Sequence, residues 1–251
     1  MNVLTLTKLK NRIKRSIERS ITRRGVVGTI RLSISKLIES IKNLAPSRRQ
    51  AIKLEREKYL EFDIKYGVDT AGFIRPNELD VNSPNYIFAE RYQPIYNVDF
   101  SQLLEDFGLR YEEYIFIDLG SGKGRPILIA SSLPFKKIIG VEFSYELNSI
   151  AKNNVSLYTG ARKCMDIELI CIDAAEYVFP KDESLVLFLY NPFQRPVMEQ
   201  VADNIISTFK EHPRRIIVIY FNPIYADIWD GISFFKKKKA EKELCIYDSN
   251  I

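Results

Sequence analysis

The sequence has few of the residues on which several kinds of catalysis and metal binding depend. Its 251 residues include a single histidine, His212, so neither a histidine-based triad nor a two-histidine metal site can be assembled. The three cysteines, Cys164, Cys171 and Cys245, are too few and too scattered for a disulfide scaffold or a zinc knuckle. We therefore expect a reducing compartment, no bound metal, and chemistry that works without imidazole.

Long apolar runs are also missing. No stretch reaches the roughly 18 to 20 apolar residues that span a bilayer, and the amino terminus lacks the compact apolar core of a secretory signal. We therefore expect a soluble, cytoplasmic protein that reaches a membrane, if at all, only at its periphery. With 46% hydrophobic and 27% charged residues, the chain has enough apolar material for one sizeable domain and an appendage.

The charge is unevenly distributed along the chain. Residues 1–58 hold 16 lysines and arginines and 4 acidic residues, which gives this segment a net charge of +12. Because the whole chain has a net charge of +5, residues 59–251 have a net charge of −7. Isoleucines and leucines recur every three or four residues over residues 6–21 and again over residues 30–41, on either side of Gly25 and Gly28. This spacing predicts two basic amphipathic helices that end near residue 46.

Several interpretations of this basic segment stay open. Its helices either pack against the rest of the chain with a solvated basic face, or bind an anionic membrane surface through apolar burial and charge attraction. An organellar targeting peptide is a further alternative. Nucleic acid is disfavoured as a partner, because the acidic remainder of the chain repels phosphate and no recognised nucleic-acid-binding motif occurs.

The pattern divides the chain into three parts. Residues 1–58 form the basic helical extension, and a third, highly charged helix over residues 48–62 leads out of it. Residues 59–98 are rich in glycine, proline and asparagine and are expected to form an ordered cap or loop region. Over residues 99–251 short apolar runs alternate with helical segments, which indicates an α/β domain with a doubly wound, Rossmann-like sheet.

The alternation also places the individual elements. We expect strands at residues 114–119, 137–143, 167–173, 185–190 and 215–221, helices at 100–107, 125–132, 145–158 and 195–211, and a closing hairpin at 233–239 and 243–247.

The segment after the first expected strand carries the chemistry. Residues 118–125 read Asp-Leu-Gly-Ser-Gly-Lys-Gly-Arg, a glycine-rich turn between a buried strand and a helix, where backbone N–H groups can contact a nucleotide-like ligand. A dinucleotide-binding turn has Gly-x-Gly-x-x-Gly, but here the third glycine comes one residue early. A phosphate-binding loop needs Gly-Lys followed by Ser or Thr, but Gly124 follows Lys123. The sequence therefore disfavours both a dinucleotide-binding turn and a phosphate-binding loop.

The pattern of an acidic residue followed by x-Gly-x-Gly-x-Gly resembles the class I methyltransferase family, which binds S-adenosyl-L-methionine (SAM) on a seven-stranded sheet. The resemblance implies the strand order 3-2-1-4-5-7-6, with strand seven antiparallel. It also implies that Glu142, at the end of the second strand, accepts the ribose hydroxyls and that Asp173, at the end of the third, meets the adenine amino group. The full set of cofactor-binding residues that it implies is Asp118, Gly120, Ser121, Gly122, Gly124, Glu142, Phe143, Asp173, Ala174 and Asn191.

A second segment bears on the methyl acceptor. Tyr190-Asn191-Pro192-Phe193 resembles the family's Asn-Pro-Pro-aromatic motif with one proline missing. The full motif is associated with methylation of amino nitrogen, which implies a catalytic role for Asn191, Pro192 and Phe193. The Asn191 side-chain oxygen and the Pro192 carbonyl would accept the hydrogens of the target amine, and the Phe193 ring would stack on the acceptor or contact a cation. Because one proline is absent, oxygen acceptors stay open.

The resemblance covers about residues 60–223. In the local sequence of the glycine segment, Asp-Leu-Gly-Ser-Gly-x-Gly, it is closest to seven-strand lysine methyltransferases. It extends to bacterial methyltransferase-like proteins of unknown substrate that carry a Tyr-Gly-Val-Asp-Thr segment, as residues 66–70 do here. The acceptor stays open between a protein lysine, a glycan, a lipid head group and a small molecule. For a lysine-like acceptor we expect an aromatic, water-poor pocket that favours the neutral amine, and the residues expected to line it are Tyr92, Tyr96, Tyr190, Phe193 and Tyr220.

Two rival functions remain beside methyl transfer. One is a catalytically inactive, cofactor-binding adaptor that acts through the basic extension. The other is a nicotinamide-dependent oxidoreductase, which the glycine spacing and the lack of an obvious proton relay disfavour.

Overall fold

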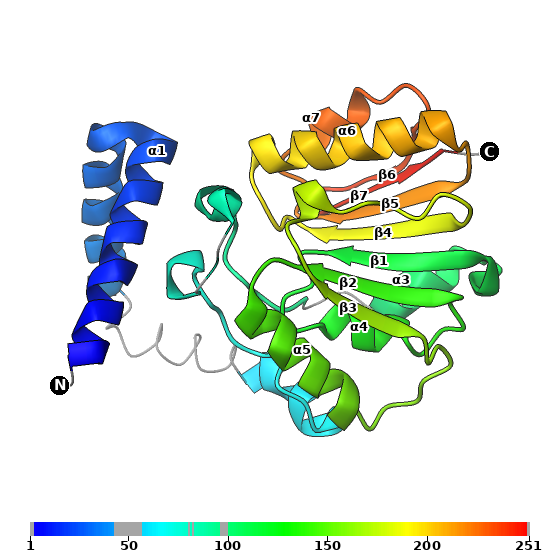
Figure 1. Ribbon diagram of the computed structural model, residues 1–251, viewed down its shortest axis with the longest axis horizontal. Helices are drawn as coiled ribbons and strands as arrows, with labels where there is room; N and C mark the ends of the chain where they lie inside the picture. Colours follow the sequence, from blue (N-terminus) through cyan, green and yellow to red (C-terminus); the bar gives the residue numbers. More distant parts are fainter. Residues whose placement is uncertain (1–2, 43–56, 80, 82, 96–99, 250–251) are drawn as a thin grey trace.

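The computed structural model describes residues 3–42, 57–79, 81, 83–95 and 100–249. A central sheet carries helices on both faces, the cap lies at one end of the sheet, and a helical hairpin lies beyond the cap (Figure 1). The arrowheads of β1 and β4 point toward the cap, so the carboxyl ends of the parallel strands face it.

Seven strands form one sheet in the order β3-β2-β1-β4-β5-β7-β6. β7 is antiparallel to its neighbours β5 and β6, and the other four pairs are parallel. The predicted fold class and strand order are therefore confirmed. The strands are β1 (Tyr114–Leu119), β2 (Lys137–Glu142), β3 (Ile167–Cys171), β4 (Ser184–Tyr190), β5 (Ile216–Phe221), β6 (Lys236–Ala240) and β7 (Leu244–Asp248).

The helices divide the apolar core into two layers. α6 (Arg195–Glu211) and α7 (Ala226–Asp230) cover one face of the sheet, while α3 (Phe100–Asp106), α4 (Arg125–Ala130) and α5 (Tyr145–Leu157) cover the other. β1 is buried along its whole length, because successive side chains point to opposite faces and both faces are covered. Ile117 accordingly packs in one layer and Phe116 in the other.

Most expected elements form close to their expected bounds, with a few differences. The expected third strand ends at Cys171, because Asp173 instead caps η4 (Ala174–Glu176) by accepting a hydrogen bond from the Ala175 N–H. The closing hairpin starts at Lys236 rather than at residue 233. The five-residue helix α7 and the short turns η1 (Pro76–Glu78), η2 (Pro84–Phe88) and η3 (Tyr111–Glu113) have no periodic signal in the sequence.

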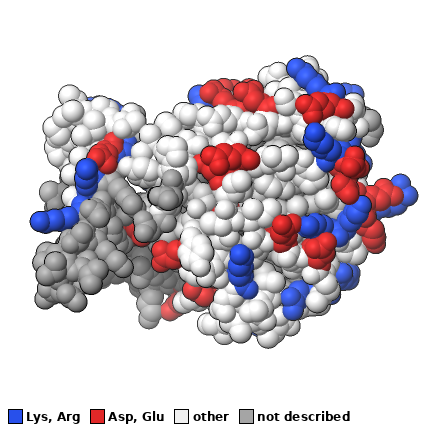
Figure 2. All heavy atoms as spheres, viewed as in Figure 1, with Lys and Arg blue, Asp and Glu red and all other residues white. Residues whose placement is uncertain are grey.

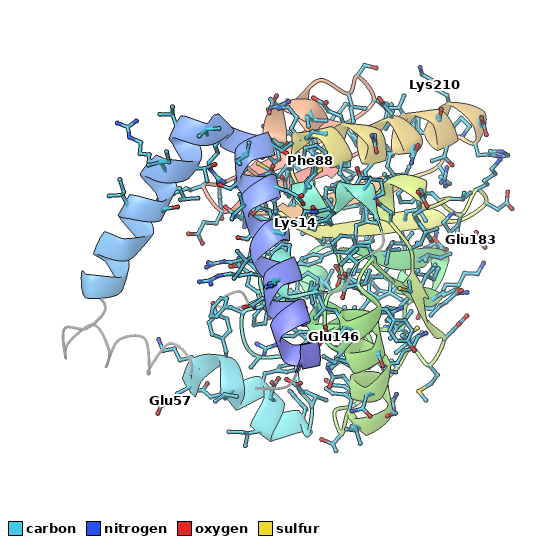
Figure 3. All side chains as sticks on the ribbon, turned by 60° about the vertical axis from the view of Figure 1, so that its left-hand side comes forward. Lys14, Glu57, Phe88, Glu146, Glu183 and Lys210 are labelled. Atoms are coloured by element: carbon cyan, nitrogen blue, oxygen red, sulfur yellow. The ribbon has the colours of Figure 1, made fainter. Side chains whose placement is uncertain are left out.

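The basic extension begins with α1 (Val3–Lys42), whose helical backbone is interrupted at Gly25 with φ 69° and ψ 176°. The chain turns back there, so that α1 is a hairpin of two helical arms (Figures 1 and 3). Two helices were expected on this segment, but the expected break near residue 46 and the start of the third helix lie outside the described residues. Helix resumes over residues 57–66.

The cap is held between α1 and the sheet. Arg19 of α1 donates a hydrogen bond from Nε to the carbonyl oxygen of Ile87 in η2, at 2.9 Å. On the other side an isolated β-bridge pairs Ala89 with Phe193, which follows β4. Within the described residues, no helix combines the length and the apolar character needed to cross a membrane.

Candidate active site

The turn after β1 is shaped by three glycines with positive φ. Gly120, Gly122 and Gly124 have φ values of 83°, 54° and 84°, a region that other residues rarely adopt. A Cβ atom on Gly120 would lie 2.3 Å from the Cβ of Pro192, and one on Gly122 would lie 2.3 Å from the Tyr92 ring. Glycine is therefore what allows this turn to pass beneath Pro192 and Tyr92.

Glu142, the last residue of β2, lies buried beside this turn. Its Oε2 accepts a hydrogen bond from the Gly122 N–H at 2.8 Å, and its Oε1 accepts one from the Ser144 N–H at 2.9 Å. Burial raises the pKa of Glu142 to about 7, although the backbone hydrogen bonds favour the ionised form. Each oxygen keeps a further lone pair, so the ionised carboxylate can still accept hydroxyl donors.

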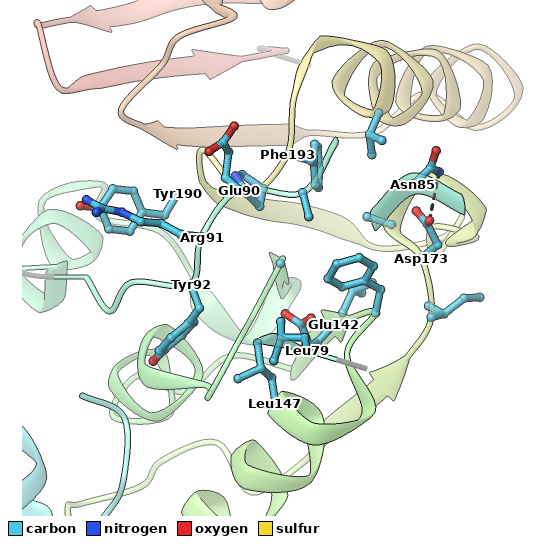
Figure 4. A pocket seen from close by; sticks show the side chains of 18 of the residues that line it. Leu79, Asn85, Glu90, Arg91, Tyr92, Glu142, Leu147, Asp173, Tyr190 and Phe193 are labelled. Atoms are coloured by element: carbon cyan, nitrogen blue, oxygen red, sulfur yellow. Dashed lines mark hydrogen bonds between the residues drawn. The ribbon is translucent and has the colours of Figure 1, made fainter. Parts of the chain in front are cut away.

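Asp173 joins the edge of the sheet to the cap. Its Oδ2 accepts hydrogen bonds from the Ser83 hydroxyl and from Asn85 Nδ2, the latter at 3.0 Å, while its Oδ1 accepts one from the Ala175 N–H at 2.9 Å. Ser83 and Asn85 both belong to the cap, and Figure 4 shows the contact between Asn85 and Asp173. The cap is thus fastened to the carboxylate expected to meet the adenine.

Glu142 and Asp173 line the same pocket, whose empty space is about 720 Å³ including its open mouth (Figure 4). The edge of the sheet contributes five of the expected cofactor residues, namely Gly120, Glu142, Phe143, Asp173 and Ala174. The cap contributes Leu79, Asn85, Ala89, Glu90, Arg91, Tyr92 and Gln93. The pocket is therefore built in comparable measure from the sheet edge and the cap.

The other expected cofactor residues do not line this pocket; they are Asp118, Ser121, Gly122, Gly124 and Asn191. Gly122 acts through its N–H on Glu142, and Gly124 begins α4. Asp118 is buried, and its Oδ2 has no hydrogen-bond partner among the described residues. Burial, and then the charge of Glu142, raise the pKa of Asp118 well above its ordinary value, which favours a neutral carboxyl.

Each of the two expected acceptor-binding oxygens already accepts one hydrogen bond within the protein and keeps a further lone pair. The Asn191 Oδ1 accepts a hydrogen bond from the Tyr220 hydroxyl at 3.2 Å, and the Pro192 carbonyl accepts one from the Glu90 N–H at 2.9 Å. Pro192 and Phe193 line the pocket, whereas Asn191 does not. The catalytic role of Asn191 and Pro192 stays a prediction, and in this arrangement neither oxygen is free of protein donors.

The expected aromatic residues are distributed between the pocket and the core. Tyr92, Tyr190 and Phe193 line the pocket. Tyr220 is buried and directs its hydroxyl to Asn191, and Tyr96 lies outside the described residues. Three of the five aromatic rings are therefore placed where an acceptor could contact them.

Two basic residues of the glycine turn hold the cap, a role that the sequence reasoning missed. Arg125 is buried and donates from Nη2 to Asp63 Oδ1 at 3.1 Å and to the Tyr59 carbonyl at 2.8 Å, and from Nε to the Thr70 hydroxyl at 2.6 Å. Lys123 donates from Nζ to Asp69 Oδ1 at 2.7 Å. The signal that could have revealed these pairs is the lysine and arginine within the glycine turn, together with the aspartates at residues 63 and 69 upstream.

The strand order, the antiparallel β7 and the glycine turn at the carboxyl end of β1 define the class I methyltransferase fold, and this chain has that fold. No protein-family model and no curated protein matches the chain.

Several solved structures resemble the chain at low identity. An rRNA methylase from Streptococcus thermophilus has 12% identity and a TM-score of 0.41, with 61% of this chain and 97% of that chain covered. A magnesium protoporphyrin IX methyltransferase from Synechocystis PCC 6803, solved with bound SAM, has 14% identity and a TM-score of 0.39, with 59% and 74% covered. A tRNA methyltransferase from Aquifex aeolicus has 12% identity and a TM-score of 0.44, with 63% and 77% covered. The assignment of the fold rests on the strand order, and the substrates named here are those of the other proteins.

Proposed function

We propose that this protein is a SAM-dependent methyltransferase. The observation that carries the proposal is the single pocket in which the glycine turn, the buried Glu142 and the cap-bound Asp173 meet at the carboxyl ends of the strands. An acceptor-only carboxylate beside a tight turn suits the two hydroxyls of a ribose, and a second carboxylate suits an exocyclic amino group. The residues present therefore fit an adenosine-containing cofactor.

The residues of the chain supply orientation rather than acid or base catalysis. When bound, SAM supplies an activated methyl group, whose transfer is an in-line displacement that needs no strong acid or base. Glu142 and Asp173 fix the two ends of the nucleoside, while Tyr92 and Phe193 exclude water from the space between the cap and the turn. Orientation of this kind contributes on the order of 7 to 11 kcal/mol to lowering a barrier.

We propose an amino nitrogen as the acceptor. The support is a set of groups that line the pocket beside the expected cofactor residues, namely the Glu90 side chain and the rings of Tyr190 and Phe193. A carboxylate and aromatic faces attract an incoming ammonium group, whereas burial among the rings opposes its charge and favours the neutral, nucleophilic amine. Protein lysines and small-molecule amines both present this group.

We also propose that the reaction takes place beside an anionic membrane surface, one of the alternatives that the sequence leaves open for residues 1–58. The excess of basic residues in this segment supports the proposal, as does the contact between Arg19 and the cap at Ile87.

Calorimetric titration of the full chain tests cofactor binding. We expect SAM and its demethylated product to bind, and Glu142→Ala to weaken binding by about tenfold or more through the loss of charge-assisted hydrogen bonds. Glu146→Ala serves as the matched control, because Glu146 is exposed on the adjoining turn of α5. Binding of NAD or ATP without binding of SAM would overturn the proposal.

Product analysis tests the reaction and the acceptor. Isotope-labelled SAM is incubated with fractionated lysate, and mass spectrometry locates the label in protein lysines, in small amines or in glycans. Label on nitrogen supports the amine proposal, and label on oxygen alone rejects it. SAM binding without any labelled product would favour the inactive adaptor.

A further inference from the structure

α1 displays two apolar stripes on its outer surface. Ile13, Ile17 and Ile21 recur at intervals of four residues along the first arm, so they share one helix face, and each is exposed. In the second arm, Val26 and Val27 stand at the apex of the hairpin with 60% and 81% of their surface exposed. Ile30 and Ile34 continue the second stripe and are also exposed. The part of the chain that the structure describes leaves all of these side chains open to solvent.

Basic side chains border both stripes. Among the described side chains of α1, Lys10, Lys14, Arg24 and Arg31 are exposed, and Glu18 is the one exposed acid. Glu18 lies 3.8 Å from Lys14 and offsets that one positive charge, which leaves a net charge of +3 on these five exposed side chains. In Figure 2 the upper left lobe, formed by α1, shows mostly uncharged surface with basic side chains beside it.

The second arm is also suited to a medium of low polarity. The Thr29 hydroxyl donates to the Gly25 carbonyl at 2.8 Å, and the Ser33 hydroxyl donates to the Thr29 carbonyl at 2.9 Å. The Ser35 hydroxyl likewise donates to the Leu32 carbonyl at 2.9 Å. Because these hydroxyls are bonded to their own helix, moving them out of water leaves no unpaired donor.

We propose that α1 docks on an anionic lipid bilayer, with the apex at Val26 and Val27 inserted among the head groups and acyl chains. An anionic bilayer offers both an apolar layer and negative charge, which matches stripes bordered by lysine and arginine. A second copy of this chain fits less well, because a two-fold contact between identical stripes would bring their basic borders together. A nucleic acid also fits less well, because it binds proteins chiefly through charge and would leave the exposed apolar side chains of Val26 and Val27 without a role.

Docking of α1 brings the cap to the membrane. The first arm contacts η1 and η2, and Arg19 bonds to Ile87 within η2. Figure 3 shows this arm, marked by Lys14, running alongside the cap near Phe88. Since η2 also supplies Asn85 to the pocket, a bilayer held by α1 lies close to the cap side of the pocket rather than to the far end of the sheet.

Vesicle flotation of the full chain tests this proposal. The probes are vesicles of phosphatidylcholine alone and vesicles of equal parts phosphatidylcholine and phosphatidylglycerol. We expect the wild type to float with the anionic vesicles only, and to be released by high salt. The double variant Val26→Asp/Val27→Asp is expected to lose about tenfold or more in partition, because it removes apolar burial and adds negative charge at the apex.

Val178→Asp is the matched control, because Val178 is also exposed but lies outside α1. This variant is expected to float as the wild type does. Equal flotation of the wild type and the apex variant would overturn the proposal, as would failure of the wild type to float. If sedimentation shows that the wild type is a dimer and the apex variant is not, the stripes bind a second copy of the chain. If the wild type and the apex variant bind RNA equally well and neither binds vesicles, α1 binds nucleic acid.

The outcome is independent of the proposed methyl transfer. The same preparations are titrated with SAM in the absence of vesicles. Protein that binds SAM but does not float rejects the docking proposal alone, and protein that floats without binding SAM rejects the proposed function alone.

Discussion

At the scale of single residues, the burial of Glu142 makes cofactor binding depend on pH. The pKa of about 7 means that the carboxyl is mostly protonated at pH 6 and mostly ionised at pH 8. Because ribose hydroxyls are expected to donate to the ionised form, we expect the affinity for SAM to rise about tenfold between these two pH values. Titration calorimetry in buffers of matched ionic strength measures this change.

Variants separate Glu142 from other titrating groups. Glu142→Gln cannot ionise and is expected to bind SAM weakly with a flatter pH profile, whereas Glu146→Gln should keep the profile of the wild type. If the affinity of Glu142→Gln for SAM rose with pH as steeply as that of the wild type, the pH dependence would not come from Glu142.

The raised pKa of Glu142 also affects the stability of the fold, and in the opposite direction, because the carboxyl of the unfolded chain ionises at lower pH than that of the folded chain. Without cofactor, the folded form is therefore expected to lose stability between about pH 4.5 and pH 7.

Asn191 adopts a left-handed backbone conformation, with φ 39°, and binds Tyr220 through its side chain. Asn191→Ala is expected to cost about 2 kcal/mol of unfolding free energy, from backbone strain and an unpaired buried hydroxyl. Asn191→Gly should cost about half as much, since glycine tolerates this φ. Urea unfolding measures both values. Loss of methyl transfer in Asn191→Gly with unchanged SAM affinity would assign the side chain the catalytic role that the resemblance implies, and unchanged transfer would reject it.

The position of the acidic residues relative to the strands is what the sequence predicts best. Glu142 ends β2 and Asp173 follows β3, the neighbouring strand of the sheet, so their meeting at one edge follows from the parallel arrangement. The sequence does not reveal that Asn85 bonds to Asp173, because Asn85 is 88 residues away in a segment without periodicity. The positions of the acids were thus predictable, whereas their partners depend on how the cap folds.

At the scale of elements, the pair formed by Arg125 and Asp63 fastens helix 57–66 to α4. Both side chains are almost fully buried, so removing one partner leaves an uncompensated charge. Arg125→Met is expected to cost about 3 to 5 kcal/mol of unfolding free energy. Arg195→Met is the matched control, because Arg195 pairs with Asp227 at 2.8 Å on the exposed surface, where such pairs contribute about 1 kcal/mol or less. Equal costs in urea unfolding would show that Arg125 is not a structural anchor.

The contact between Asn85 and Asp173 is expected to slow the release of cofactor. Asn85→Ala removes one of the cap's two hydrogen bonds to this carboxylate and leaves the bond from Ser83. We therefore expect SAM to dissociate about five- to tenfold faster, with a smaller change in its association rate. Stopped-flow displacement by the demethylated product measures both rates. Asn153→Ala, on the outer side of α5, is the control, and equal rates in both variants would contradict the role of Asn85.

The helices and strands that could be predicted from sequence are those that bury at least one face in the apolar core. β1 and α6 have the bounds expected from sequence. Burial on both faces of β1 leaves an unbroken apolar run, and burial of one face of α6 leaves a helical period. α7 has five residues, which is too short for any period to show. The cap is fixed by contacts from Lys123 and Arg125 to residues more than 50 positions away, which a local pattern does not contain.

At the scale of the whole molecule, charge and fold divide the chain at nearly the same place. The basic residues concentrate in the segment that contains α1, while the acidic remainder contains the sheet and the pocket. The order of the strands followed from the resemblance of the glycine segment alone, because no pattern within a strand specifies its neighbour. The hairpin shape of α1 did not follow from periodicity, since both arms have the same helical spacing and only Gly25 marks the turn.

This division predicts that the sheet and cap form a stable unit without α1. α1 contacts the described part of the chain chiefly at η1 and η2, whereas helix 57–66 is tied to α4 through the buried Arg125. A chain that lacks residues 1–42 is therefore expected to keep its SAM affinity within about threefold and to lose no more than about 1 kcal/mol of unfolding free energy. Titration calorimetry and urea unfolding measure the two quantities. A shortened chain that folds but no longer binds SAM would contradict this prediction. It would show that α1 positions the cap over the pocket, with Arg19 holding η2 against Asp173.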